Sequence, residues 1–363
     1  MNISSRTRST RPARRSRGSR PIYAPFRVRK WPRGSSVRGA WALVLLGLSP
    51  SALWADPTES ENGLSWLRKM ASASRQLNYT GTFVYRHGND IEASRIVHYV
   101  NAAGGEFEKL ETLDGPPREV IRTNDQVTCY LPNTKTVLIE KRSGRRFPAL
   151  LPAQLTGGLA QHYTVRQSGM GRAAGYDCRV VVLMPKDRLR YGHEFCAEAS
   201  SGLPLRAKTF NEKGTLLESF AFTEVKLGGK FDRDKVQSRY AAESRSWKIG
   251  RAASSSADRP GRTGWVLASE LPGFRKVTES KRSIAGHGTT VSHLVYSDGL
   301  AAVSVFIEPL PKSRPPRRLS HQGAVNIYIR LVADHMVTAL GEAPAETVMR
   351  IANSLEYRGA PGK

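Results

Sequence analysis

Cysteine is scarce in this chain of 363 residues, which contains only Cys129, Cys178 and Cys196. Three cysteines at such wide spacing exclude a disulfide-rich framework and a zinc knuckle. Cys129 lies in the strand-like stretch QVTCYL and Cys178 in YDCRVVVL, so these two could pair across a sheet. Alternatively, all three are buried thiols that pack as small apolar side chains. The sequence leaves both possibilities open.

Motifs for catalysis and metal binding are also missing. The eight histidines show neither an H-E-x-x-H arrangement nor cysteine partners at zinc-ligand spacing, and no G-x-S-x-G segment places a nucleophile. GMGRAA (169–174) fits G-x-G-x-x-A, but a strand-like stretch follows it, whereas a dinucleotide site requires a helix there. We therefore predict that the protein is not an enzyme and uses no metal or cofactor. A secreted hydrolase is the least supported alternative.

The first 55 residues lack acidic side chains and contain 12 Arg or Lys. Their final part, VRGAWALVLLGLSPSALWA, places Arg38 before an apolar stretch and ends on the small residue Ala55, as a signal peptide does. The apolar stretch is much shorter than the roughly 20 residues that a membrane-spanning helix needs. We predict that residues 1–55 are a basic extension and a signal peptide, and that the mature chain is exported.

The arginine-rich arm RSTRPARRSRGSRP precedes this signal. Such an arm could bind nucleic acid, but that function does not suit an exported chain. We therefore interpret it as an overlong leader or as the result of a start placed too early, with Val28 or Val37 as possible true starts. No nucleic-acid partner is predicted. The remaining chain still carries 44 basic against 31 acidic residues, which favours an anionic partner.

After the leader, hydrophobic periodicity predicts one amphipathic helix over 58–77, where Trp66, Met70, Ala73 and Leu77 recur at helical spacing. Strand patterns separated by Gly, Asn or Asp every 8 to 12 residues then predict an antiparallel meander. A second helical candidate is LPAQLTGGLAQHY (151–163), and APAETVMRIANSLEY predicts a closing helix. The fold class is therefore α+β and mainly antiparallel β. The predicted domains are 56–237 and 264–363, joined over 238–263 by a flexible linker rich in Ser, Arg, Ala and Gly.

The stretch RYGHEFCAEASSGLPLRAKTFNEKGTLLESFAF (190–222) reads as three strands joined by two turns and is apolar on both faces. An open, strongly curved sheet with helices in its mouth could use the second face to hold an acyl chain or an apolar peptide helix. An ordinary sandwich, in which that face packs on another sheet, fits the pattern equally well.

Several long segments resemble the MucB/RseB family of periplasmic regulators of the envelope-stress sigma factor. They include YTGTFVYRHG, EFEKLETLDGPPREVIR, CYLPNTKTVLIEKR, YSDGLAAVSVFIEP and VTALGEAPAETVMRIANSLE. The resemblance implies a larger domain like the lipoprotein carriers (LolA-like), an unclosed barrel with helices in its mouth, and a smaller α+β domain. The chain departs from the family pattern at Cys196 and Ala197, where a bulkier apolar pair followed by an acid is expected.

The resemblance also implies a function. Family members bind the periplasmic segment of a membrane-anchored anti-sigma factor, shield it from site-1 proteolysis, and are released by mislocalised lipopolysaccharide or lipoprotein. A periplasmic lipid or lipoprotein carrier is the alternative, and the sequence does not determine whether the chain forms a homo-oligomer. Candidates for lining a lipid pocket are the aromatic residues Phe83, Tyr85, Tyr191, Phe195, Phe220 and Phe222. Candidates for contacting phosphate groups are Arg145, Arg146, Arg188 and Arg190.

Overall fold

The structure, a computed structural model, describes residues 57–359 except 125, 142–150, 152–157, 231, 252–258, 284–289 and 311–317. The predicted signal peptide, the basic arm and the alternative starts lie outside these residues. All described residues belong to one compact unit of the chain. No helix among them is long and apolar enough to cross a membrane.

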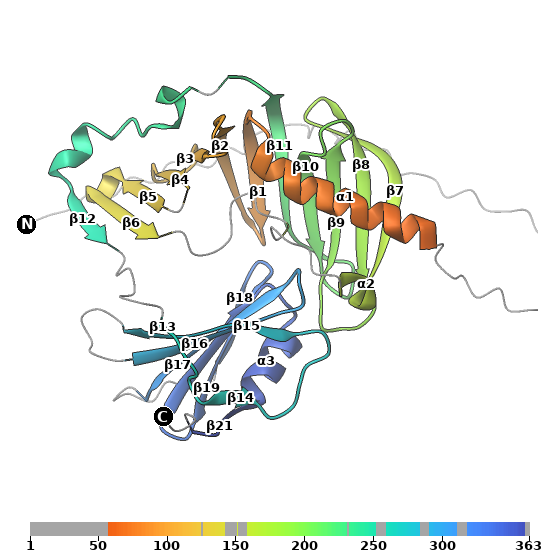
Figure 1. The fold of residues 1–363 in the computed structure, drawn as a ribbon, viewed down its shortest axis with the longest axis vertical. Helices are drawn as coiled ribbons and strands as arrows, with labels where there is room; N and C mark the ends of the chain where they lie inside the picture. Colours follow the sequence, from red (N-terminus) through yellow and green to blue (C-terminus); the bar gives the residue numbers. More distant parts are fainter. Residues whose placement is uncertain are drawn as a thin grey trace, which may run out of the picture. The chain divides into compact units, whose positions relative to one another are not determined.

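The described residues form mainly β-strands (Figure 1). Twelve strands make the first sheet, in the order β12-β6-β5-β4-β3-β2-β1-β11-β10-β9-β8-β7. Their bounds are β1 Tyr79–His87, β2 Asp90–Val100, β3 Glu106–Thr112, β4 Glu119–Thr123, β5 Gln126–Leu131, β6 Thr136–Lys141, β7 Tyr163–Ala173, β8 Tyr176–Pro185, β9 Gly192–Glu198, β10 Pro204–Phe210, β11 Leu216–Leu227 and β12 Lys248–Arg251.

A second sheet contains seven strands, in the order β13-β15-β16-β17-β20-β19-β18. Their bounds are β13 Arg259–Pro260, β15 Arg275–Ser283, β16 Thr290–Ser297, β17 Ala302–Pro309, β18 Arg318–Gln322, β19 Val325–Val332 and β20 His335–Gly341. A small pair joins β14 (Trp265–Leu267) to β21 (Leu355–Tyr357). The α-helices are α1 Pro57–Gln76, α2 Leu159–His162 and α3 Ala345–Asn353, and the 3-10 helices are η1 Pro132–Thr134, η2 Asp234–Val236 and η3 Glu243–Ser246.

The antiparallel meander predicted from the sequence is confirmed. Strands that follow one another along the chain pair in the order β1 to β6 and again β7 to β11, all antiparallel. The two turns of the stretch 190–222 contain Gly202 and Gly214, whose φ angles of 79° and 74° suit glycine. In the first sheet, β7 and β12 stand at opposite ends of the order and do not pair, so the predicted unclosed sheet is also confirmed.

Helix α1 covers one face of the first sheet where β7 to β10 lie (Figure 1). Its buried Leu67 and Met70 join the same apolar cluster as Val181, Phe195 and Ala207. The last three residues are direct cross-strand neighbours on β8, β9 and β10, so they share a face of the sheet. The amphipathic periodicity of 58–77 therefore predicted both the helix and its packing side.

The helical candidates at 151–163 and at the end of the chain are only partly helical. Within 151–163, residues 159–162 form α2, and 152–157 lie outside the described residues. The closing helix is confirmed as α3, but the SLEY sequence that we included in it supplies strand β21. That strand pairs with β14, almost 90 residues earlier in the chain, which local periodicity cannot reveal.

The segment that we predicted as a flexible linker from residue 238 is ordered over its first part. Residues 248–251 form β12, which pairs in parallel with β6. Glu119 on β4, whose side chain is fully buried, accepts hydrogen bonds from the Ser238 hydroxyl at 2.6 Å and the Arg239 amide at 3.1 Å. Trp247 is 5% exposed and packs against Tyr240. The segment has no hydrophobic periodicity, so we predicted it as flexible. Its order depends on contacts with residues far away in the sequence, which local patterns do not reveal.

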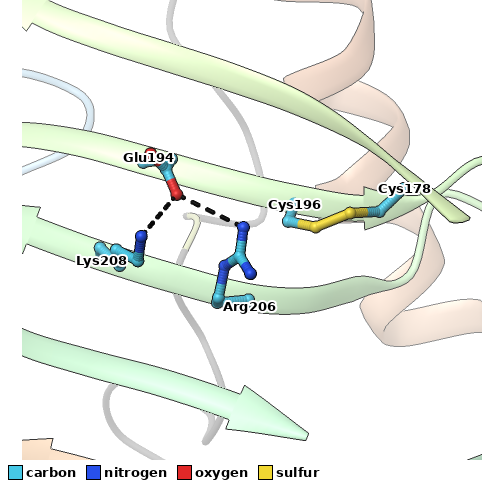
Figure 2. Close-up of a disulfide and its surroundings, with 5 residues drawn as sticks. All are labelled: Cys178, Glu194, Cys196, Arg206 and Lys208. Carbon is cyan, nitrogen blue, oxygen red and sulfur yellow. Dashed lines mark ion pairs between the residues drawn. A yellow bond between two sulfur atoms is a disulfide. The ribbon is translucent and has the colours of Figure 1, made fainter. Parts of the chain in front are cut away.

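A disulfide joins Cys178 on β8 to Cys196 on β9, with 5.4 Å between the Cα atoms (Figure 2). The pairing of Cys129 with Cys178 that we considered is therefore wrong. Seven strands separate β5, which carries Cys129, from β8 in the sheet order. Both bonded cysteines are fully buried, and Glu194, two residues before Cys196, forms ion pairs with Lys208 at 3.0 Å and Arg206 at 3.6 Å.

The turn after β9 is stabilised by the carboxylate of Glu198, which is 8% exposed. It accepts hydrogen bonds from the amides of Ser200 at 3.0 Å and Ser201 at 2.6 Å. Burial acts to raise the pKa of Glu198, but the hydrogen bonds from Ser201 and Ser200 outweigh it and the pKa lies below 4.5. This stabilisation is therefore complete above the unfolded pKa and is lost as the pH falls through the folded pKa.

We expect Glu198→Gln to lower the free energy of unfolding by about 1–2 kcal/mol at pH 7, because the two amides lose a charged acceptor. The difference from wild type should shrink as the pH falls through the lowered pKa of folded Glu198, because the carboxyl group is then protonated in the native state as well. Urea unfolding at several pH values measures both effects. Glu212→Gln, at an exposed turn position, is the matched control; an equal loss in the two variants would contradict this account.

Candidate functional site

Four of the six predicted lipid-pocket residues meet on neighbouring strands. Phe83 on β1 lies opposite Phe222 on β11, and Tyr85 lies opposite Phe220. The ring centroids of Phe83 are 5.0 Å from Phe220 and 6.0 Å from Phe222. The three phenylalanines are at most 4% exposed, and the Tyr85 hydroxyl donates a hydrogen bond to Glu218 at 2.7 Å. These residues, the aromatic cluster, form a packed apolar wall, and acyl-chain binding there stays a prediction.

The other two candidates lie elsewhere. Phe195 packs under α1 in the cluster that contains Leu67 and Met70. Tyr191, just before β9, accepts a hydrogen bond from the Asn326 side chain of β19 at 2.9 Å. Burial raises the pKa of Tyr191 to about 12, although the hydrogen bond from Asn326 opposes the shift. Tyr191 thus contacts the second sheet and does not join the aromatic cluster.

Tyr191 belongs to a buried junction in which residues 187–191, between β8 and β9, meet the second sheet. Leu189 lies in the apolar cluster of the second sheet, and Leu300, from the turn between β16 and β17, lies in the cluster under α1. The Thr347 hydroxyl of α3 donates a hydrogen bond to the Leu189 carbonyl at 2.8 Å. Each side therefore contributes a leucine to the core of the other, which ties the two sheets together.

Arg190 is the central charge of this junction and is 1% exposed. Its Nε donates to Asp298 at 2.7 Å, its Nη2 donates to the Pro272 carbonyl at 2.6 Å, and its Nη1 pairs with Asp187. The guanidinium also lies 5.0 Å from the ring centroid of Phe274. Our prediction that Arg190 contacts the phosphate of a ligand is therefore wrong, because its donors are buried and occupied.

The remaining phosphate-contact candidates have different outcomes. Arg188 is exposed, two residues before Arg190, so contact with an anion there stays a prediction. Arg145 and Arg146 lie outside the described residues. Of the four candidate arginines, the structure therefore describes only Arg188 and Arg190.

Asp298 is the partner of Arg190 that we did not predict from the sequence. The Asp298-Gly299 pair lies in the turn that connects β16 to β17. One carboxylate oxygen accepts the amides of Leu300 at 2.9 Å and Ala301 at 2.8 Å, while the other accepts Arg190 and the Tyr163 hydroxyl, the latter at 3.4 Å. The Asp-Gly sequence indicates a turn, but nothing near it indicates that Arg190, 108 residues away along the chain, is the partner of Asp298.

Close approach of the backbone at Gly273 completes the junction. A Cβ atom there would lie 2.2 Å from Nη2 of Arg190 and 2.4 Å from Nε2 of His162, and the φ angle is 79°. Glycine is required on both grounds. Burial and the nearby positive charge of Arg190 lower the pKa of His162.

The charges of the junction serve its internal contacts. The Arg190 and Asp298 side chains are fully buried and lie 2.7 Å apart, so each charge is neutralised by the other. Within the described ranges, no group of three or more His, Cys, Asp or Glu side chains is placed to hold a metal ion. The junction therefore holds the first sheet against the second.

Comparison with known families matches both parts of the chain. Residues 62–240 match the model of the MucB/RseB N-terminal domain, and residues 259–356 match that of the MucB/RseB C-terminal domain. The chain belongs to the MucB/RseB family. The resemblance seen in the sequence is thereby confirmed over both halves.

Relatives within the MucB/RseB family are similar over most of their length. The sigma factor AlgU regulatory protein MucB of Pseudomonas aeruginosa is 33% identical over 327 residues, covering 88% of this chain and 98% of that protein. The sigma-E factor regulatory protein RseB of Escherichia coli is 23% identical, covering 81% and 90% respectively. A crystal structure of MucB in complex with MucA(peri) is 30% identical with a TM-score of 0.64, covering 82% of this chain and all of that one.

Proposed function

We propose that this protein is a periplasmic regulator that binds the periplasmic segment of a membrane-anchored anti-sigma factor. The observation that carries the proposal is the solved complex of MucB with MucA(peri), since this chain covers that whole MucB chain at 30% identity. Relatives named as AlgU and sigma-E regulatory proteins support the same role. The protein acts by binding and carries out no reaction of its own.

The proposed mechanism is shielding. The anti-sigma segment engages both domains, 56–237 and 264–363, and while bound it is inaccessible to the site-1 protease. Mislocalised lipopolysaccharide or lipoprotein then displaces the regulator, so that the segment is cleaved and the sigma factor is freed. The open first sheet supports a place for acyl chains. Export by the N-terminal signal peptide brings the chain to the compartment where this segment lies.

A periplasmic lipid or lipoprotein carrier is the second candidate. It is favoured by the open sheet, whose cluster of Phe83, Phe220 and Phe222 is apolar. The seven-stranded second sheet argues against it, because a carrier has no evident need of a second core tied to the first by Arg190 and Asp298. The regulator is therefore the better supported function.

A pull-down tests the proposal directly. The chain from residue 56 onward is immobilised and presented with the periplasmic segment of the anti-sigma factor from the same genome, with and without lipopolysaccharide. We expect retention that the glycolipid abolishes, while a scrambled segment of equal charge is not retained. A chain that ignores the segment but co-purifies with lipid and passes it to another protein would establish the carrier instead.

A further inference from the structure

A cavity of about 250 Å³ lies in the second half of the protein, outside the junction and the aromatic cluster. Three segments that are distant in sequence surround it. They contribute Arg262, Trp265, Lys276, Glu279 and Arg358 to its lining. The volume is small for a ligand of drug size, for which pockets of roughly 300–1,000 Å³ are usual. It suits a compact group.

Specific contacts hold these three segments together. Trp265 on β14 pairs with Tyr357 on β21, and the Arg358 amide donates to the Gly264 carbonyl at 2.9 Å. The Thr263 hydroxyl donates to Glu279 of β15 at 2.8 Å. Backbone pairing and a half-buried hydrogen bond therefore hold together the segments that surround the cavity.

The lining carries three cations, Arg262, Lys276 and Arg358, against a single carboxylate, Glu279. That carboxylate is already occupied by Lys276 and by the amide and hydroxyl of Thr263. Burial acts to raise the pKa of Glu279, but hydrogen bonds from Lys276 and Thr263 outweigh it and the pKa is lowered. Glu279 thus stays ionised and paired, and the other charged residues of the lining are cations.

The two arginines remain available to a ligand. The Arg358 guanidinium lies 3.6 Å from Glu356, with the two side chains 64% and 55% exposed, and an ion pair in such an exposed place contributes little. Arg262 is exposed and makes no ion pair with any described residue. Guanidinium groups bind phosphate through two parallel hydrogen bonds.

A buried phenol lies on β16, the strand that pairs with β15 at Lys276. Tyr296 is opposite Lys276 in the pairing of β15 with β16 and is 3% exposed. Its hydroxyl has no hydrogen-bond partner within the described ranges. Burial, and after it the charge of Glu279, raise the pKa of Tyr296 to about 12, so the phenol stays protonated.

We propose that this cavity binds a phosphate group, held by Arg262 and Arg358 with Lys276 beside them and Trp265 as an apolar wall. The phosphate can belong to a lipid headgroup or be free in solution. The site goes beyond the binding of an anti-sigma segment, which needs no phosphate. A failure of phosphate binding would therefore not contradict the proposed binding of the anti-sigma segment, and the reverse also holds.

Isothermal titration calorimetry with inorganic phosphate tests the site. The protein used is the chain from residue 56 onward, which contains every described residue. We expect the double variant Arg262→Gln/Arg358→Gln to bind at least about tenfold more weakly, because both bidentate donors are lost. The matched control is Arg318→Gln/Arg350→Gln. It removes the same charge at exposed sites of the same half and should bind like wild type. All four substituted side chains are exposed, so folding should be kept, as circular dichroism verifies.

Vesicle flotation distinguishes the two sources of phosphate. Wild type and both variants are mixed with phosphatidylcholine vesicles with and without phosphatidic acid. Capture by the acidic vesicles that only the pocket variant loses identifies a headgroup, whereas binding of inorganic phosphate without such capture identifies a soluble phosphate. Either result supports the site. The absence of saturable binding in both assays, or equal losses in the pocket and control variants, would overturn it.

Discussion

Asp298→Ala is expected to lower the free energy of unfolding by about 3–5 kcal/mol, because it leaves the Arg190 charge buried without its main partner. Both side chains are fully buried, and the Nε to carboxylate distance is 2.7 Å. The variant also removes the acceptor for the amides of Leu300 and Ala301. Urea unfolding followed by circular dichroism measures the loss.

A double-mutant cycle separates the charge pair from the turn. Arg190→Met should lower the free energy of unfolding far less in the Asp298→Ala background than in wild type, because the buried Arg190 charge has already lost Asp298 there. The exposed pair of Glu346 and Arg350 is the control, and Glu346→Ala should change stability by less than about 1 kcal/mol. If the two substitutions lower the free energy of unfolding additively, the pair of Arg190 and Asp298 does not hold the junction together.

Replacing both bonded cysteines, Cys178→Ala/Cys196→Ala, is expected to lower the free energy of unfolding by about 3 kcal/mol. The estimate follows from the loop entropy that a cross-link over 18 residues removes from the unfolded chain. Reductant should destabilise wild type by a similar amount and leave the variant unchanged. Urea unfolding with and without reductant measures both.

Cys129→Ala is the matched control for the disulfide. Cys129 lies on β5 and takes no part in the cross-link, so we expect a loss of less than about 1.5 kcal/mol and full sensitivity to reductant. Peptide mapping without reduction should recover the peptides of Cys178 and Cys196 joined. A joined Cys129 peptide, or a double variant as stable as wild type, would contradict the assignment.

Local features of the sequence predicted most of the elements. Turn residues such as Gly202 and Gly214 marked the hairpins, and the apolar spacing around Met70 marked α1, because both signals depend on residues close in the chain. The pairing of consecutive strands could also have indicated the disulfide. Once β8 and β9 are read as a hairpin, Cys178 and Cys196 lie diagonally across it, whereas seven strands separate β8 from the strand that carries Cys129.

Long-range contacts account for what the sequence did not predict. Arg190 in a turn reads as an exposed cation, since nothing nearby reveals that Asp298 and the Pro272 carbonyl enclose it. Likewise, the stretch 238–251 has no periodicity of its own and becomes ordered through Glu119 and β6. The partner itself was predictable only from family resemblance, because binding surfaces carry no motif comparable to those of catalysis.

The most direct test of the regulator proposal is a protection assay. The periplasmic segment of the anti-sigma factor is incubated with the site-1 protease in the presence or absence of the chain from residue 56 onward, and the intact segment is followed over time. We predict that a stoichiometric amount of the chain prevents cleavage, while cleavage of an unrelated substrate of the same protease continues at its usual rate. Cleavage of the segment at an unchanged rate, with the chain present in excess, would contradict the proposal.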